Sequence, residues 1–71
     1  MNQQVNIQDK FLHEIKINDC QVEIFLINGY KMSGKIVNFD NFVIILKTED
    51  KEMLIYKHAI STIIPSLIIK I

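Results

Sequence analysis

The stretch "INGYKMSGKIVNFDNFVIIL", residues 27–46, decides the fold. Asn28-Gly29 is the strongest short signal for a hairpin turn between two strands. Asp40-Asn41 marks a second turn, and the residues between the two turns form one long predicted strand. Gly34 lies in the middle of that strand, where a glycine indicates a bend or a bulge. The stretch therefore predicts a strongly bent antiparallel sheet.

A helix is expected before this stretch, at about residues 6–17. Asn6 is its candidate N-cap, and helical spacing gives one apolar stripe of Ile7, Phe11, Leu12 and Ile15. Five strands are expected after the helix, at about residues 20–27, 30–39, 42–48, 52–56 and 60–64, and an apolar tail at 66–71. This order predicts one mostly β domain over residues 1–71, a helix followed by a small, bent, antiparallel SH3-like barrel. We expect the tail either to pack on a neighbour as a strand-like segment or to be an artefact of where the chain was cut.

The composition excludes several classes of protein. Cys20 is the only cysteine, so no disulfide can form within the chain. Together with the distant His13 and His58 it cannot supply a zinc site, and no metal or other cofactor is predicted. The formal net charge is zero over 71 residues, with eight lysines and no arginine, which argues against coating nucleic acid by charge alone. A chain this small usually needs added support, and oligomerisation is the remaining candidate.

The sequence predicts a cytoplasmic protein that is not an enzyme. The first ten residues are polar, which excludes a signal peptide there, and no apolar run is long enough to span a bilayer. A single unpaired cysteine suits a reducing compartment. No nucleophile–base pair, paired carboxylates or glycine-rich phosphate loop is visible. Asp40 is interpreted as a turn residue rather than as a general base.

The stretch "IYKHAIST", residues 55–62, places Lys57 and His58 at the joint of the last two predicted strands. Short apolar edge strands invite pairing with another copy. Pairing of the fourth strand with the fifth strand of the next copy is head-to-tail and can close into a ring. A ring would gather Lys57 and His58 into a circle of positive charge. The alternative is that this turn is only solvated.

Four segments resemble the Hfq family of bacterial RNA chaperones, which are Sm-like proteins. They are "NIQDKFL" (6–12), "FLINGYKMSGKI" (25–36), "FDNFVIILK" (39–47) and "IYKHAISTIIP" (55–65). They occur in the family's order and spacing, and together they cover residues 6–65. The resemblance implies an Sm-like fold and a homohexameric ring that binds small regulatory RNAs and messenger RNAs. It further implies a role in small RNA–mRNA pairing and stability, post-transcriptional regulation and the stress response.

The resemblance implies a proximal face that takes uridine-rich single strands. Its matching positions are Gln8, Asn41, Phe42, Tyr56, Lys57 and His58. Lys57 and Gln8 can donate hydrogen bonds to uracil carbonyl oxygens. Phe42 can stack on a base, although its position after a turn is equally compatible with core packing. Tyr56 is expected to pack between subunits.

The resemblance also implies a distal face that takes adenine-rich strands. Its matching positions are Phe25, Gly29, Tyr30, Lys31, Met32, Ser33, Met53, Ser61 and Thr62. Phe25 alternates with the apolar face of its strand, which favours an exposed stacking role over core packing. Several family members have Gln where Ser33 and Met53 stand, so direct amide recognition of adenine is not expected to be retained.

The third site that the family implies is a basic rim at the end of the helix. The corresponding segment here is "HEIKIND", residues 13–19, in which only His13 and Lys16 can carry positive charge. The rim is therefore depleted, and strand annealing that depends on rim charge should be weak.

Two other hypotheses remain open at the level of sequence. The first is a structural or protein-interaction SH3-like barrel whose lysines are solvated, which the neutral charge and the absence of arginine favour. The second is a monomeric barrel of the OB type. An RNA-binding ring would purify as an oligomer with bound nucleic acid, and the alternatives would not.

Overall fold

A computed structural model describes residues 6–71 and begins with helix α1, Ile7–Ile17. Asn6 caps the helix, since its side-chain oxygen accepts a hydrogen bond from the N–H of Asp9 at 3.1 Å. Leu12 and Ile15 are buried, as the apolar stripe predicts. Ile7 is 66% exposed, so its predicted place in the stripe is wrong. It lies in the first turn, and the buried pair lies more than one turn further along.

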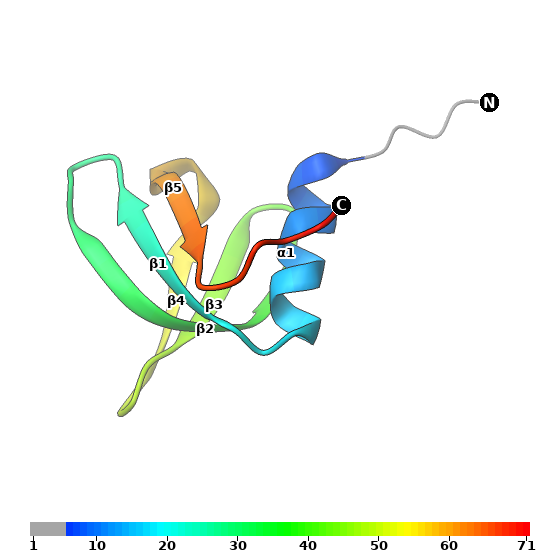
Figure 1. Ribbon diagram of the computed structural model, residues 1–71. Coiled ribbons are helices and arrows are strands. Elements are labelled where there is room, and N and C mark those ends of the chain that lie inside the picture. Colours follow the sequence, from blue (N-terminus) through cyan, green and yellow to red (C-terminus); the bar gives the residue numbers. More distant parts are fainter. Residues whose placement is uncertain (1–5) are drawn as a thin grey trace.

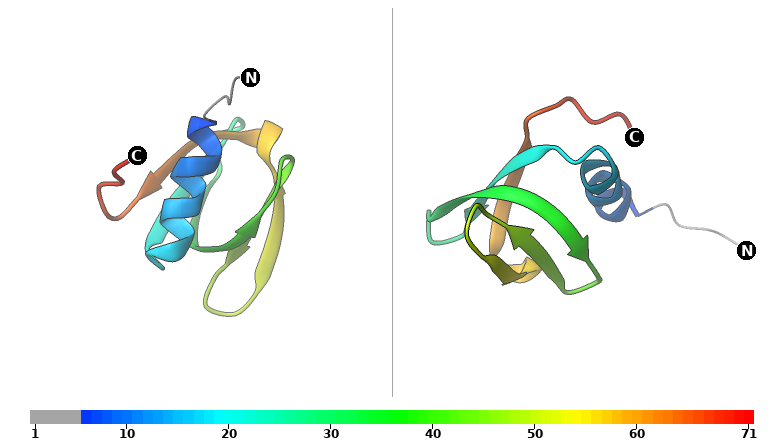
Figure 2. Two further views of the ribbon diagram at one scale, coloured as in Figure 1. Left: turned by 90° about the vertical axis from the view of Figure 1, so that its right-hand side faces the viewer. Right: turned by 90° about the horizontal axis from the view of Figure 1, so that it is seen from below.

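Five strands follow the helix and form one antiparallel sheet. They are β1 (Gln21–Leu26), β2 (Lys31–Phe39), β3 (Val43–Lys47), β4 (Glu52–Tyr56) and β5 (Ile60–Pro65). The short 3₁₀ turn η1, Lys57–Ala59, joins the last two strands. The order across the sheet is β4-β3-β2-β1-β5, so β4 and β5 are its two outer strands. The helix packs beside this curved sheet (Figures 1 and 2).

The bend of the sheet has two local causes in β2. Gly34 is buried, and a Cβ atom there would press against the carbonyl group of Lys47 and lie 3.2 Å from Leu46 Cγ. Glycine therefore permits the end of β3 to cross close over β2. A register shift between Ile36 and Asn38 adds a bulge three residues further on. The sheet consequently curls on itself, as the view from below shows (Figure 2).

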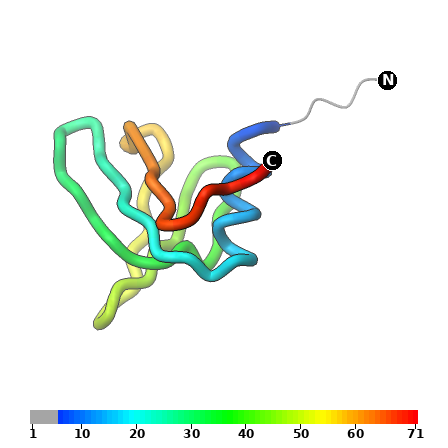
Figure 3. Tube along the Cα trace, in the orientation of Figure 1, coloured from blue at the N-terminus to red at the C-terminus, as the bar shows by residue number. Residues whose placement is uncertain are grey.

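The β1–β2 connection is the predicted Asn-Gly turn. Gly29 has a φ of 90°, which an L side chain rarely adopts. The side-chain oxygen of Asn28 accepts a hydrogen bond from the N–H of Tyr30 at 3.0 Å. The tip of this hairpin projects away from α1, so the helix and the hairpin lie at opposite sides of the molecule (Figure 3).

The core is formed by apolar side chains from the helix and from the first four strands. Its buried members are Leu12, Ile15, Cys20, Val22, Ile24, Ile36, Ile44, Leu46 and Ile55. The outer strands keep large apolar side chains exposed: Leu54 and Tyr56 on β4, and Ile64 on β5. The segment 66–71 has no regular structure and runs back toward α1 (Figure 1). Ile69 packs against the core there, whereas Ile68 is 91% exposed.

Candidate nucleic-acid interface

The turn between β2 and β3 and the turn η1 lie side by side. The N–H of Lys57 donates to the carbonyl of Phe42 at 2.8 Å. The Asp40 carboxylate accepts hydrogen bonds from the N–H groups of Phe42 and Val43, both at 2.8 Å. These two bonds, chiefly the one from Phe42, lower the pKa of Asp40, and the charge of Lys57 lowers it further. Asp40 thus fixes the turn that carries Phe42.

The aromatic side chains at this end face solvent. Phe42 is 72% exposed, which excludes the core-packing alternative for it within one chain. Tyr56 is 56% exposed, and its ring centroid lies 5.7 Å from that of the exposed His58. Asn41 is exposed on the same turn as Phe42. Flat, accessible rings beside a cation are what stacking of unpaired bases requires.

Lys57 is the unusual residue of this end. Its side chain is only 13% exposed, and Nζ has no hydrogen-bond partner among residues 6–71. The nearest carboxylate oxygen, Asp9 Oδ1, is 3.6 Å away, and the centre of the Phe39 ring is 5.6 Å away. A buried ammonium with free donors is costly unless something accepts them. The solvated-turn hypothesis is therefore wrong for Lys57, although His58 is exposed.

The Lys57 side chain lines a pocket of about 260 Å³, here called the helix-side pocket. Its lining residues are Gln8, Phe11, Leu12, Ile44, Lys57, Ile60, Ser61, Thr62 and Ile63. Gln8 is exposed in the first turn of α1, so an amide and an ammonium from distant segments line one pocket. Both groups donate hydrogen bonds, and the remaining walls are mostly apolar. This arrangement suits a flat ring that carries carbonyl oxygens.

A second hollow of about 450 Å³, here called the hairpin-side pocket, lies beneath the β1–β2 turn. Its lining residues are Phe25, Leu26, Ile27, Gly29, Ser61, Thr62 and Ile64. Four of the residues expected on a distal face therefore lie together in one chain. Tyr30 is 65% exposed beside this pocket, at the hairpin tip, and Lys31 forms an ion pair with Glu23 at 3.5 Å.

Three other residues of the expected distal set lie elsewhere in the single chain. Met32 and Met53 pack against the core. Met53 is in β4, at the other end of the strand order from β5, and it does not line the hairpin-side pocket. Ser33 is exposed and lines two further hollows.

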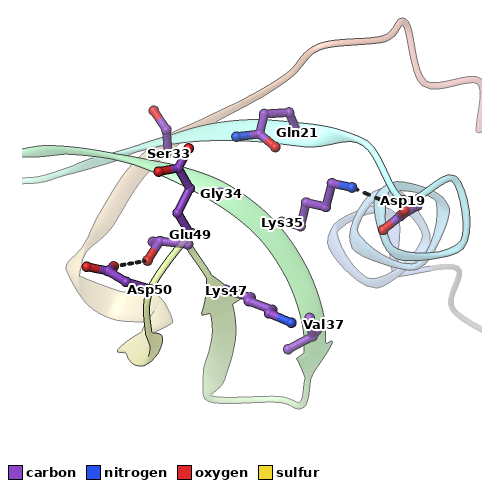
Figure 4. Close-up of a pocket in the computed structure, with 10 residues that line it drawn as sticks. Asp19, Gln21, Ser33, Gly34, Lys35, Val37, Lys47, Glu49 and Asp50 are labelled. Carbon is purple, nitrogen blue, oxygen red and sulfur yellow. Dashed lines mark hydrogen bonds and ion pairs between the residues drawn. The ribbon is translucent and has the colours of Figure 1, made fainter.

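A third hollow, of about 720 Å³, lies between the end of α1 and the β3–β4 turn (Figure 4). Its lining residues are Asp19, Gln21, Ser33, Gly34, Lys35, Val37, Lys47, Thr48, Glu49 and Asp50. Lys35 and Asp19 form an ion pair across it at 3.2 Å. It mixes both signs of charge and touches neither pocket described above. The expected rim residues His13 and Lys16 are exposed on α1 and do not line it.

Asp9 and Phe39 contact Lys57, and the sequence analysis did not predict either role. Asp9 is next to Gln8 in the sequence, in the turn that Asn6 caps. Its position beside a candidate site residue could therefore have indicated a role at the site. Phe39 is the first aromatic of "FDNF", in which only the second aromatic, Phe42, is a predicted site residue. The register pairs Phe39 with Ile44, and the Lys57 amine lies over the ring from another segment.

Residues 6–71 contain neither a cluster of metal ligands nor a helix that could span a membrane. These residues contain no group of three or more His, Cys, Asp or Glu side chains placed to hold a metal ion. Within the same range, α1 is too short and too polar to cross a bilayer, and no other helix could do so.

A helix followed by a bent, five-stranded antiparallel barrel, with basic and aromatic groups at the turns, defines a protein of the Sm-like class. The model of the Hfq protein family matches residues 7–70, so the chain belongs to the Hfq family. The RNA-binding protein Hfq of Bacillus thuringiensis (strain Al Hakam) is 49% identical over 65 residues, 92% of this chain and 88% of that protein.

Solved structures agree with this assignment. The crystal structure of "the pleiotropic translational regulator, Hfq" matches with a TM-score of 0.81 and 47% identity, over 83% of this chain and 98% of that one. An Hfq protein from Anabaena sp. matches with a TM-score of 0.76 and 24% identity, over 83% and 95% of the two chains. The second match supports the fold alone.

Proposed function

We propose that this chain is an RNA chaperone that assembles into a homohexameric ring and binds unpaired RNA. Uridine-rich strands occupy the proximal face, which includes the helix-side pocket, and adenine-rich strands occupy the distal face, which includes the hairpin-side pocket. The ring holds a small regulatory RNA and a messenger RNA together, since many copies of each pocket raise the effective concentration. Both partners are cytoplasmic, and we propose the same location for the protein. The proposal involves no catalytic step and no cofactor.

The observation that carries this proposal is the Lys57 amine in the helix-side pocket. It has unused donors, it lies in a pocket with the Gln8 amide, and the exposed Phe42 ring is on the neighbouring turn. A uracil can accept hydrogen bonds from both donors while a ring stacks on its face. His58 and Asn41 are exposed nearby and can contact the ribose and phosphate.

Ring assembly is supported by the two outer strands. Each has a strand neighbour on one side only, and each exposes large apolar side chains. Pairing of β4 with β5 of the next copy satisfies the open edges and covers Leu54, Tyr56 and Ile64. The same step carries Met53 toward the neighbouring copy's Phe25 and Tyr30, which completes the proposed adenine pocket from two chains.

Binding assays and mass measurements together test the proposal. The purified protein should bind a short fluorescent oligo-uridylate and a short oligo-adenylate at once, and native mass spectrometry should give six chains. The outcome that contradicts the proposal is a folded monomer with no affinity for either strand. That result would favour the hypothesis of a protein-interaction barrel. The similarity to proteins named "RNA-binding protein Hfq" argues against that hypothesis.

A further inference from the structure

One short segment of β5 separates the two pockets. Among residues 6–71, Ser61 and Thr62 line both the helix-side pocket and the hairpin-side pocket, and no other residue of that range lines both. The helix-side pocket takes its other walls from α1, β3, η1 and further residues of β5, and the hairpin-side pocket takes them from the β1–β2 hairpin and Ile64 of β5. A ligand that contacts these two residues in one pocket therefore also changes the hydrogen bonds that they can form in the other pocket.

A bulge explains why two consecutive residues serve both pockets. In a regular strand, neighbouring side chains point to opposite faces. Here Leu26 pairs with Ile60 and Phe25 pairs with Thr62, so Ser61 has no partner on β1. An extra residue of this kind breaks the alternation locally, and bulges often occur next to binding sites. The two hydroxyl oxygens lie 3.1 Å apart as a result.

The two hydroxyl groups share one hydrogen bond, in which either can be the donor. The hydrogen bonds within residues 6–71 give neither hydroxyl group another side-chain or backbone partner. Each hydroxyl group has a single proton. If Ser61 donates to a base, then Thr62 must donate to Ser61, and the proton of Thr62 is no longer available. The converse holds when Thr62 donates to a base.

We propose that the Ser61–Thr62 hydroxyl pair couples the two pockets, so that RNA bound in one pocket weakens the binding of RNA in the other. Uracil carbonyl oxygens and adenine ring nitrogens are both hydrogen-bond acceptors. With both pockets occupied, one acceptor loses its donor, or the bond between the hydroxyl groups breaks. The inference rests on the proposed function and concerns the regulation of the same two sites.

The test compares affinities with the opposite pocket empty and filled. The affinity for a fluorescent oligo-uridylate is measured alone and with saturating oligo-adenylate, and then with the two roles exchanged. Both strands should weaken each other by the same factor, because coupling between two sites is reciprocal. We expect a factor of about two to ten, which corresponds to the net contribution of one hydrogen bond.

Two variants separate this mechanism from simple repulsion between two polyanions. Ser61→Ala together with Thr62→Val removes both hydroxyl groups, so the coupling factor should fall to about one. Thr62→Ser keeps the hydroxyl and should retain the coupling. Native mass spectrometry checks that each variant assembles as the parent protein does. The coupling factor is a ratio, so a change in either affinity alone does not affect it.

The results of this test distinguish a failure of the coupling from a failure of the proposed function. Tight but independent binding of both strands would overturn the coupling and leave the proposed function intact. Coupling that survives removal of both hydroxyl groups, or strands that strengthen each other, would likewise overturn it. Failure of both strands to bind would overturn the proposed function and the coupling with it.

Discussion

At the scale of single residues, Lys57 and Asp40 illustrate opposite ways of placing a charge. The Asp40 carboxylate is exposed and accepts two backbone hydrogen bonds, so it stabilises a turn. The Lys57 amine is buried and has no acceptor within 6–71, apart from the longer ion pair with Asp9. An unpaired buried donor costs free energy in the absence of a ligand, and it strengthens binding when a ligand supplies the acceptor.

We predict that Lys57→Ala weakens oligo-uridylate binding by about ten- to a hundredfold, because hydrogen bonds from a charged donor contribute about 1.5–3 kcal/mol. Binding of oligo-adenylate should hardly change. Tyr30→Ala is the matched control at the hairpin tip and should produce the reverse pattern. Fluorescence anisotropy with both strands measures this, and equal losses on both strands would contradict two separate faces.

We predict that Asp40 makes the stability depend on pH in acid. Its pKa in the folded protein is below the ordinary value of 3.8, so the unfolded chain binds more protons there. The stabilisation is complete above the ordinary value and is lost as the pH falls through the lowered pKa. Asp40→Asn keeps a side-chain acceptor for the turn and should flatten this dependence of the thermal midpoint. Asp50→Asn, in another exposed turn, is the control and should leave the acid dependence in place.

At the scale of the elements, β2 owes its bend to a position with no room for a side chain. Gly34 lies under the carbonyl of Lys47, where any Cβ would collide with the backbone. Gly29, by contrast, has open space around it and is required only for its positive φ. Of the two glycines in the chain, one is therefore needed for packing between strands and one for the shape of a turn.

Gly34→Ala should lower the free energy of unfolding by about 1–3 kcal/mol, the usual cost of overpacking. The collision is with backbone, which cannot move aside as a flexible side chain could. Ser33→Ala, at the exposed neighbouring position, should change it by about 0.5 kcal/mol or less. Chemical denaturation of both variants measures the difference. Equal free energies of unfolding for Gly34→Ala and Ser33→Ala would mean that β3 does not approach β2 as closely as described.

The last turn of α1 carries little of the charge that strand annealing would need. Lys16 is exposed and is the only basic residue of that turn. Lys16→Ala should change the annealing rate of two complementary strands by about twofold or less, because one exposed charge contributes a few tenths of a kcal/mol. A fluorescence-transfer assay follows the rate. A large defect would mean that the helix end is an active rim after all.

At the scale of the whole molecule, the proposed function depends on what covers the two outer strands. β4 and β5 lie at opposite ends of the strand order, so one copy cannot satisfy both edges by itself. Leu54 on β4 and Ile68 in the tail are both exposed and apolar, but only Leu54 is on an outer strand. This pair allows edge pairing to be distinguished from nonspecific association.

Leu54→Lys should convert the ring into smaller species, since a lysine on an edge strand opposes pairing with another copy. Ile68→Lys adds the same charge away from the edge and should leave the ring intact. Sedimentation of the two variants measures this difference. An intact ring with Lys at position 54 would place the interface elsewhere. Loss of the ring should weaken binding of both RNA strands together.

The order of elements and the bends could be predicted from the sequence, because their causes are local. The Asn28-Gly29 turn, the capping of α1 by Asn6 and the turn at Asp40 each depend on residues a few positions apart. Alternation along β1 likewise marks Val22 and Ile24 as core. The family motifs predict the binding residues, and six of these line one of the two pockets: Gln8, Phe25, Gly29, Lys57, Ser61 and Thr62.

Burial and shared surfaces were decided only by the tertiary structure. The Lys57 amine is buried, and it lies 3.6 Å from Asp9 Oδ1 and over the ring of Phe39, two residues that are distant from it in sequence. The bulge that turns Ser61 and Thr62 toward both pockets exists only in the register between β5 and β1. Turn chemistry and periodicity are properties of neighbouring residues, whereas these features require long-range contacts whose register no short stretch specifies.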